Sequence, residues 1–139
     1  MMLKRVIVAV IFMFIALGAG CTREASFKQD VYPILQKSCL SCHAVGGKGY
    51  AVSGFSVESY ESVMKGTKFG PVIVPGSSIS STLVILVEHK ADPSISMPRR
   101  TEQTLAEHNK FLKSWKVPML PLEQIKLIRD WIDQGAKNN

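Results

Sequence analysis

The chain has 139 residues, which is enough for one domain, because compact domains commonly contain roughly 100–150 residues. Lys and Arg number 17 against 11 Asp and Glu, and the sequence has no block of like charges and no basic run interleaved with aromatic residues. This distribution argues against a nucleic-acid-binding protein. The mild positive balance suits docking to acidic protein partners.

The first 20 residues are typical of a bacterial export signal. Lys4 and Arg5 form a charged start, and residues 6–17 form an unbroken apolar run that small residues follow. This run is shorter than the roughly 20 residues that a membrane-spanning helix needs. We therefore expect residues 1–20 to be a signal peptide and not a retained membrane helix.

A cysteine follows directly after this signal. The sequence Leu17-Gly-Ala-Gly-Cys21 resembles a bacterial lipoprotein signal, in which cleavage leaves a lipid-modified cysteine at the mature N-terminus. It departs from the usual pattern, because Gly18 and not Leu lies three places before the cysteine. Since an odd cysteine in an exported protein otherwise needs a partner, we favour lipid on Cys21 over an unmodified thiol. Residues 21–25 are then a short tether that holds a domain at 26–139 on the periplasmic side of a bacterial membrane.

The first elements of this domain follow from apolar spacing and glycine content. Apolar residues at helical spacing predict a short amphipathic helix over 26–37, capped by Ser26 and bent or started by Pro33. The glycine-rich stretch 44–54 is predicted to be loop. A second helix is expected over 56–65, with Gly66 as its stop.

The rest of the chain is also predicted to lack strands. The expected elements are extended chain over 70–76, a helix capped by the serines at 77–81 and ended at Asp92-Pro93, a loop around Met97-Pro98, and helices over 101–115 and 122–134. Without alternating strand patterns, the prediction is a small all-α domain. Its core is thin, and domains of this size often depend on a cofactor or a cross-link.

Two of the three cysteines and one of the three histidines lie together in Cys39-Leu-Ser-Cys42-His43. This spacing is typical of covalent haem attachment, in which two thiols bond the porphyrin and the following histidine binds its iron. A helical turn places both sulfurs on one side, and the adjacent imidazole then reaches the iron. Export favours this interpretation further, because c-type haem is attached outside the cytoplasm.

Three other interpretations of this motif are weaker. A zinc site needs four ligands, and the sequence has no further cysteine except Cys21. A thioredoxin-type dithiol would follow a strand in a βαβ unit, a pattern that the sequence does not show. A disulfide between Cys39 and Cys42 would close a very small loop, add little stability and leave His43 without a role.

A second axial ligand for the iron is expected downstream of the motif. Methionine opposite histidine raises the reduction potential and suits electron transfer. The candidates are Met64, His89, Met97, His108 and Met119. The positions of the first, second and fourth are more typical of core or helix-end residues. Met97 and Met119 both lie beside proline in predicted loops, and spacing alone does not separate them.

Four stretches of the chain form a wider pattern: Phe27 and Asp30-Val-Tyr-Pro-Ile-Leu35 before Cys39–His43, Gly70-Pro-Val-Ile-Val-Pro-Gly76 before Ser81-Thr-Leu83, Asp92-Pro before Ser96-Met-Pro98, and Ile128-Arg-Asp-Trp-Ile-Asp-Gln-Gly-Ala136. Together they resemble the planctomycete-type cytochrome c domain of the class I cytochrome c superfamily, over nearly the whole chain after the signal. The resemblance implies four to five short helices around one covalently bound haem. It also implies that the Met-Pro pair supplies the distal iron ligand, which is Met97.

The chain departs from this family after the Met-Pro pair. Members usually reach the last helix sooner, whereas here an insertion at about 99–117 intervenes. The insertion brings Met119 to the place just before the last helix, so Met119 stays the alternative distal ligand.

The ligand set determines the expected function. With His43 and a methionine on the iron, no coordination position stays open for a substrate. We therefore expect no enzyme but an exported mono-haem c-type cytochrome, free or as a subunit of a larger oxidoreductase, that carries single electrons between redox partner proteins in the bacterial envelope. The alternative is a haem-based sensor or small-ligand-binding module with a displaceable methionine. Cations near the ligand-bearing segments are candidates for steering an acidic partner: Lys37, Lys48, Lys65, Lys68, Lys90, Arg99 and Arg100.

Overall fold

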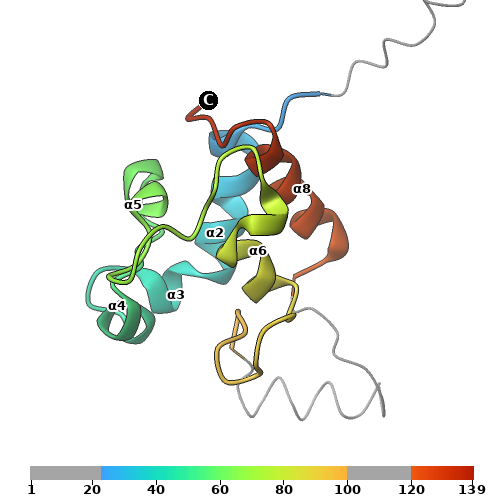
Figure 1. The fold of residues 1–139 in the computed structure, drawn as a ribbon. Coiled ribbons are helices and arrows are strands. Elements are labelled where there is room, and N and C mark those ends of the chain that lie inside the picture. The colour runs from blue at the N-terminus through green and yellow to red at the C-terminus, as the bar shows by residue number, and fades with distance from the viewer. Residues whose placement is uncertain (1–22, 100–119) are drawn as a thin grey trace, which may run out of the picture.

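The computed structural model describes residues 23–99 and 120–139 (Figure 1). These ranges contain six α-helices, one π-helical turn and one 3-10 turn, and no strand apart from an isolated bridge between Thr67 and Gly70. The predicted all-α fold is confirmed. Within the same ranges, no helix is long and apolar enough to cross a bilayer. Several predictions lie outside the described residues: the signal peptide, lipid on Cys21, the helix over 101–115 with His108, the insertion beyond Arg99, and Met119.

The predicted first helix is present in two parts, η1 (Phe27–Val31) and α2 (Tyr32–Ser38). The Ser26 hydroxyl accepts a hydrogen bond from the Gln29 amide at 3.2 Å, as expected of a residue that caps a helix start. Pro33 is the second residue of α2, a position near a helix start at which the fixed φ of proline suits the helix. The turn before it is π-helical, which is wider than an α-helical turn. The helix therefore changes from π to α geometry just before the proline and continues through it.

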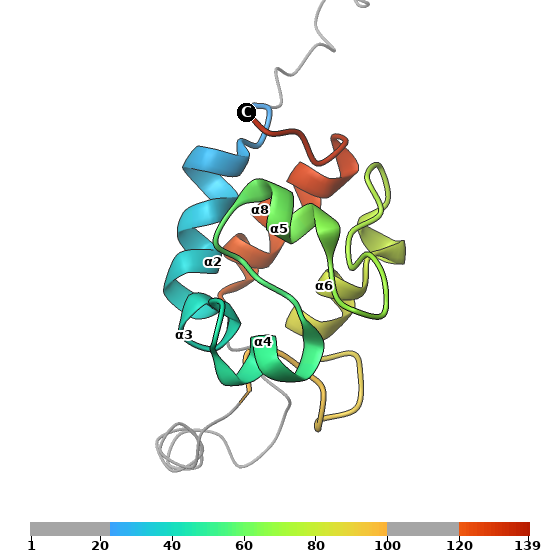
Figure 2. The ribbon, with the colours of Figure 1, turned by 90° about the vertical axis from the view of Figure 1, so that its left-hand side faces the viewer.

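The last helix, α8 (Leu122–Asp133), packs against η1 (Figure 2). Phe27 is at the centre of this contact, since its ring centroid lies 5.3 Å from that of Trp131 and 5.2 Å from that of Tyr60. Trp131 is fully buried. The predicted helix over 122–134 is thereby confirmed, and Gly135 follows it with a φ of 101°.

Three short elements complete the fold beside this helix pair: α5 (Tyr60–Lys65), η2 (Ser78–Ser80) and α6 (Thr82–Val87). The helix predicted over 56–65 begins later than expected, because Ser59 and Ser62 form a capping box at its start. The segment 70–76 contains no helix, as predicted, and Val72 and Ile73 are buried, but residues 75–76 form a turn in which Gly76 has a φ of 83°.

The predicted end of α6 at Asp92-Pro93 is wrong. The helix stops at Val87, since His89 adopts a left-handed conformation with a φ of 53°. The His89 amide donates to Leu86 O at 3.1 Å and the Lys90 amide donates to Ile85 O at 3.0 Å, which is the hydrogen-bond pattern of a Schellman helix end.

The prediction of loop over 44–54 is also wrong. The cysteine motif forms α3 (Leu40–His43), and the glycine-rich stretch contains a second helix, α4 (Lys48–Ser53). Gly46 and Gly54 have positive φ angles of 87° and 73° and mark the bends on either side of α4. The helices α3 and α4 lie at the end of the molecule opposite the C-terminus (Figures 1 and 2).

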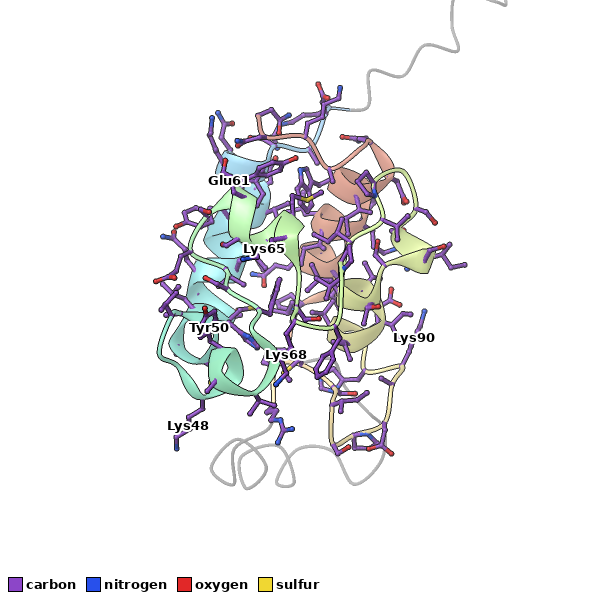
Figure 3. The ribbon with its side chains drawn as sticks, turned by 60° about the vertical axis from the view of Figure 1, so that its left-hand side comes forward. Lys48, Tyr50, Glu61, Lys65, Lys68 and Lys90 are labelled. Carbon is purple, nitrogen blue, oxygen red and sulfur yellow. The ribbon has the colours of Figure 1, made fainter. Side chains whose placement is uncertain are left out.

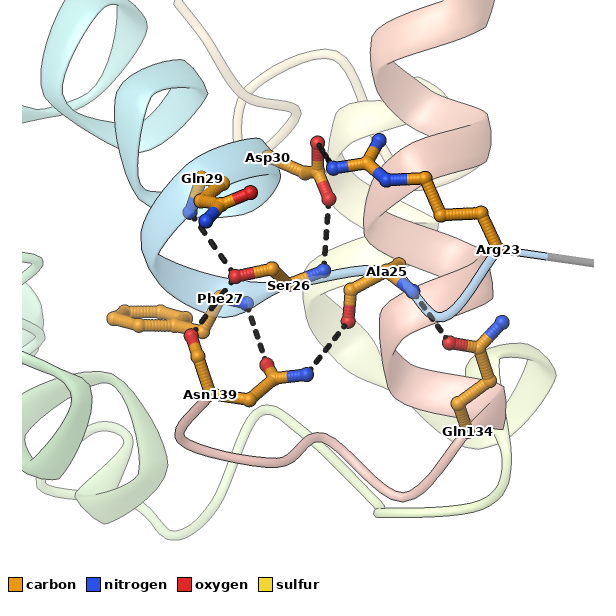
Figure 4. A network of polar contacts seen from close by, with 8 residues as sticks. All are labelled: Arg23, Ala25, Ser26, Phe27, Gln29, Asp30, Gln134 and Asn139. Carbon is orange, nitrogen blue, oxygen red and sulfur yellow. Dashed lines mark hydrogen bonds and ion pairs between the residues drawn. The ribbon is translucent and has the colours of Figure 1, made fainter.

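A network of hydrogen bonds joins residues 23–28 to the last residues of the chain (Figure 4). The Ala25 amide donates to Gln134 Oε1 at 2.7 Å, and the Phe27 amide donates to Asn139 Oδ1 at 2.9 Å. The Ser26 hydroxyl donates to the backbone carbonyl of Asn139 at 2.9 Å. Ala25, the last residue of the predicted tether, is buried against the domain.

Candidate haem-attachment site

The three residues of the attachment motif lie on one short turn. Cys39 ends α2 and begins α3, and the His43 amide donates to Cys39 O at 2.9 Å. Cys42 is exposed, Cys39 is half-buried, and neither forms a disulfide. Neither thiol is consumed by a disulfide, and Cys42 is open to a group that packs beside α3.

His43 is held in a defined orientation. Its side chain is buried, and Nδ1 lies 3.1 Å from the backbone carbonyl oxygen of Phe55. Because a carbonyl only accepts hydrogen bonds, Nδ1 carries the proton, and the lone pair is then on Nε2. Within residues 23–99 and 120–139 the structure shows no hydrogen bond to Nε2. This is the tautomer that an iron-binding imidazole requires, with the hydrogen bond of its second nitrogen to a backbone carbonyl fixing the ring.

Two glycines of the predicted loop make room for this arrangement. A Cβ at Gly49 would lie 2.8 Å from His43 Cε1 and 2.9 Å from His43 Nε2. A Cβ at Gly47 would lie 2.5 Å from the carbonyl oxygen of Cys42. All three distances are too short for a side chain, so α4 approaches the motif this closely only because these positions are glycine.

The chemistry of Cys39 differs from that of a redox dithiol. Burial, together with the nearby Cys42, raises the pKa of the Cys39 thiol to about 11. Reactive dithiols have a lowered pKa, because the thiolate is the attacking species. The described residues also contain no group of three or more His, Cys, Asp or Glu side chains that could hold a metal ion.

Met97 lies in the loop that follows α6. Its amide donates to Leu86 O at 3.1 Å, its side chain is half-buried, and the peptide bond to Pro98 is cis. The segment 91–99 runs at the same end of the molecule as α3 and α4 (Figures 1 and 2). The structure thus brings Met97 to the end that carries the attachment motif.

The other candidate ligands have different surroundings. Met64 packs against the hydrophobic core, as predicted. His89 is half-buried and occupies the left-handed position after α6.

Sequence reasoning missed two contributors to the site, the carbonyl of Phe55 and the backbone at Gly49. A backbone carbonyl leaves no signal in residue type. The cluster of glycines after His43 was such a signal, since glycine marks close approach as well as loop.

An all-α fold, a turn that carries two thiols, and a histidine with Nε2 available define a small cytochrome c-like domain. Residues 39–100 match the family model described as Planctomycete cytochrome C. The resemblance to the planctomycete-type cytochrome c domain is thereby confirmed over residues 39–100, a segment that contains both the attachment motif and Met97. The comparison with curated proteins and the comparison with solved structures gave no match.

Proposed function

We propose that the chain is an exported mono-haem c-type cytochrome that carries single electrons between redox partners in the bacterial envelope. The observation that carries the proposal is the Cys39–His43 turn, in which the Phe55 carbonyl sets the histidine tautomer for iron binding. The fit of the residues to a haem supports it, because thiols and imidazole are the groups that c-type attachment uses.

Each residue of the set has a separate role in this proposal. Cys39 and Cys42 would hold the porphyrin through thioether bonds, and His43 and Met97 would bind its iron, with Met119 as the alternative to Met97. The bound haem supplies the one-electron chemistry of its iron. The chain holds and orients that group, and the thioether sulfur of a methionine favours the reduced state.

The proposal excludes a substrate-converting role for the isolated domain. With His43 and a methionine both bound to it, the iron would offer no further position to a substrate. The domain is then an electron carrier, free or as a subunit of a larger oxidoreductase.

Export and a lipid anchor complete the proposal. The apolar run at 6–17 and the small residues before Cys21 support cleavage there and lipid on the new N-terminal cysteine. Acyl chains would hold the domain at the periplasmic side of a membrane without spanning it.

An acidic redox partner fits the charge at the α4 end of the domain. Figure 3 shows Lys48, the first residue of α4, with Lys65 and Lys68 higher in the same view and Glu61 toward the opposite end. The Lys68 ammonium lies 5.1 Å from the centre of the exposed Phe69 ring. Cations near an attachment site raise the encounter rate with an acidic protein surface.

The absorption spectrum of the ferric protein tests the ligand set. We expect the weak far-red sulfur-to-iron charge-transfer band, and we expect it to disappear in a Met97→Ala variant and to persist in Met119→Ala. Persistence in Met97→Ala with loss in Met119→Ala would transfer the distal role to Met119. A high-spin spectrum of the unmodified protein would favour the sensor or ligand-binding alternative.

A further inference from the structure

The position of Met97 depends on the C-terminal end of α6. Leu86 O accepts the amide of Met97 at 3.1 Å and that of His89 at the same distance. The residues between them form a closed turn, in which the amides of Ile95 and Ser96 both donate to Asp92 O at 3.0 Å. Ser96 is buried, with 3% of its surface exposed. The hydrogen bond from the Met97 amide therefore joins this turn to the last turn of α6.

That last turn contains a conformation that needs support. His89 has a φ of 53°, in the left-handed region, and a residue with a Cβ pays roughly 1–2 kcal/mol there. Neighbouring contacts must hold the turn in place. The residue before it, Glu88, makes two of these contacts.

Glu88 joins the end of α6 to α8. Its Oε1 lies 2.7 Å from Arg129 Nη1, and its Oε2 lies 2.6 Å from Lys90 Nζ. The Glu88 side chain is only 15% exposed, and Arg129, at 34%, is the least exposed cation among the ion pairs of the described residues. A shielded pair of this kind is screened less than an exposed one. The bond to Arg129 is thus a fixed link between the end of α6 and α8, through two residues that are 41 positions apart in the chain.

We propose that Arg129 is a positioning residue for the distal ligand: through Glu88 it holds the α6 end whose Leu86 carbonyl carries the Met97 backbone. This inference rests on the proposed function, in which Met97 binds the iron. Arg129 does not touch Met97 in this account. It restricts the motion by which the Met97 segment would leave the iron.

The test uses the full-length, haem-loaded ferric protein and imidazole as the competing ligand. We expect imidazole to displace the methionine about tenfold faster in Arg129→Met than in the unmodified protein, because a hydrogen bond between charged groups is lost. The same change is expected in Glu88→Gln, and the double variant should add little, since both substitutions break one link. Arg129→Lys should restore part of the original rate.

Lys126→Met is the matched control. It removes an exposed ion pair to Asp130 on the same helix, so the displacement rate should not change. Loss of the far-red band at a lower denaturant concentration than global unfolding is the second readout. A merely structural role for Arg129 would make the two transitions shift together.

An unchanged displacement rate in Arg129→Met and Glu88→Gln would overturn the inference, and so would a joint shift of both transitions. If Arg129→Met does not fold, the displacement rate and the denaturant dependence of the far-red band in Glu88→Gln test the inference instead. Absence of the far-red band from the unmodified protein would overturn the proposed ligand set itself, and the two failures are told apart by that first spectrum.

Discussion

At the scale of single residues, the site depends on how closely the backbone approaches His43. The Phe55 carbonyl fixes one ring nitrogen, and the missing Cβ of Gly49 leaves room at the other edge. The motif Cys39–His43 was predicted from the sequence, because its residue types and spacing are themselves the signal. Its supports were not, since a main-chain oxygen and an absent side chain carry no chemical signature.

Gly49→Ala should lower the stability of the haem-loaded protein. Helix propensity alone would stabilise α4 by about 1 kcal/mol. The new methyl group, however, would overlap the fixed ring of His43, and overpacking costs about 1–3 kcal/mol. We expect a net loss in the free energy of unfolding, measured by denaturant titration. Ala51→Gly, in the same helix, calibrates the propensity term, and a gain in stability for Gly49→Ala would contradict the account.

Glu88 makes part of the stability depend on pH. Burial alone would raise the pKa of Glu88, but hydrogen bonds and charges from Lys90 and Arg129 outweigh it, so the pKa lies below its ordinary value of 4.5. A lowered carboxylate pKa stabilises the fold above the unfolded value, and this contribution is lost as the pH falls through the folded value. We expect under about 1 kcal/mol from this group, lost below pH 4.5 and absent in Glu88→Gln. If the free energy of unfolding of the unmodified protein and that of Glu88→Gln changed in parallel between neutral and acid pH, this expectation would be contradicted.

At the scale of elements, the sequence predicted the helices that rest on apolar periodicity and misjudged those that rest on local backbone chemistry. The first and last helices were correct because Phe27, Ile128 and Trp131 repeat on buried faces. The helix α4 was missed because its glycines were interpreted as loop residues, whereas they allow the backbone of α4 to lie close to Cys42 and His43. The early stop of α6 was missed because His89, not glycine, takes the left-handed position.

Side-chain hydrogen bonds join η2 to α8. Asp133 accepts hydrogen bonds from the Ser78 amide at 2.6 Å and from the Ser78 hydroxyl at 2.9 Å, and Ser78 is buried. Asp133→Ala should lower the free energy of unfolding by about 2–3 kcal/mol, because two buried donors lose their partner. Asp130→Ala, which removes an exposed pair on the same helix, should cost under about 1 kcal/mol. If Asp133→Ala and Asp130→Ala lowered the free energy of unfolding equally, the contact of Asp133 with Ser78 would contribute no more stability than an exposed ion pair.

At the scale of the whole molecule, the contacts between the two chain ends and the candidate haem-attachment site lie at opposite ends of the domain. One end holds the network between residues 23–28 and Asn139, and the opposite end holds α3, α4 and the Met97 segment (Figures 1, 2 and 4). No sequence pattern predicts this arrangement, because contacts such as Ala25 to Gln134 or Glu88 to Arg129 join positions far apart in the chain. The fold class was nevertheless predictable, since it needs only the periodicities.

This separation predicts where charge affects electron transfer. Lys48→Gln and Lys68→Gln should each slow reduction by a small acidic electron-transfer protein at low ionic strength, and added salt should remove the difference. Lys28→Gln, in η1 at the other end, is the control and should leave the rate constant unchanged. Stopped-flow rate constants that do not depend on ionic strength would count against steering.

The central claim is covalent attachment of one haem at Cys39 and Cys42. The most direct measurement is the mass of the mature protein, expressed with haem-attachment machinery and extracted with acidified acetone. We expect a mass equal to that of the processed chain plus one haem, with the red colour retained by the protein. A colourless protein with the mass of the chain alone would contradict it.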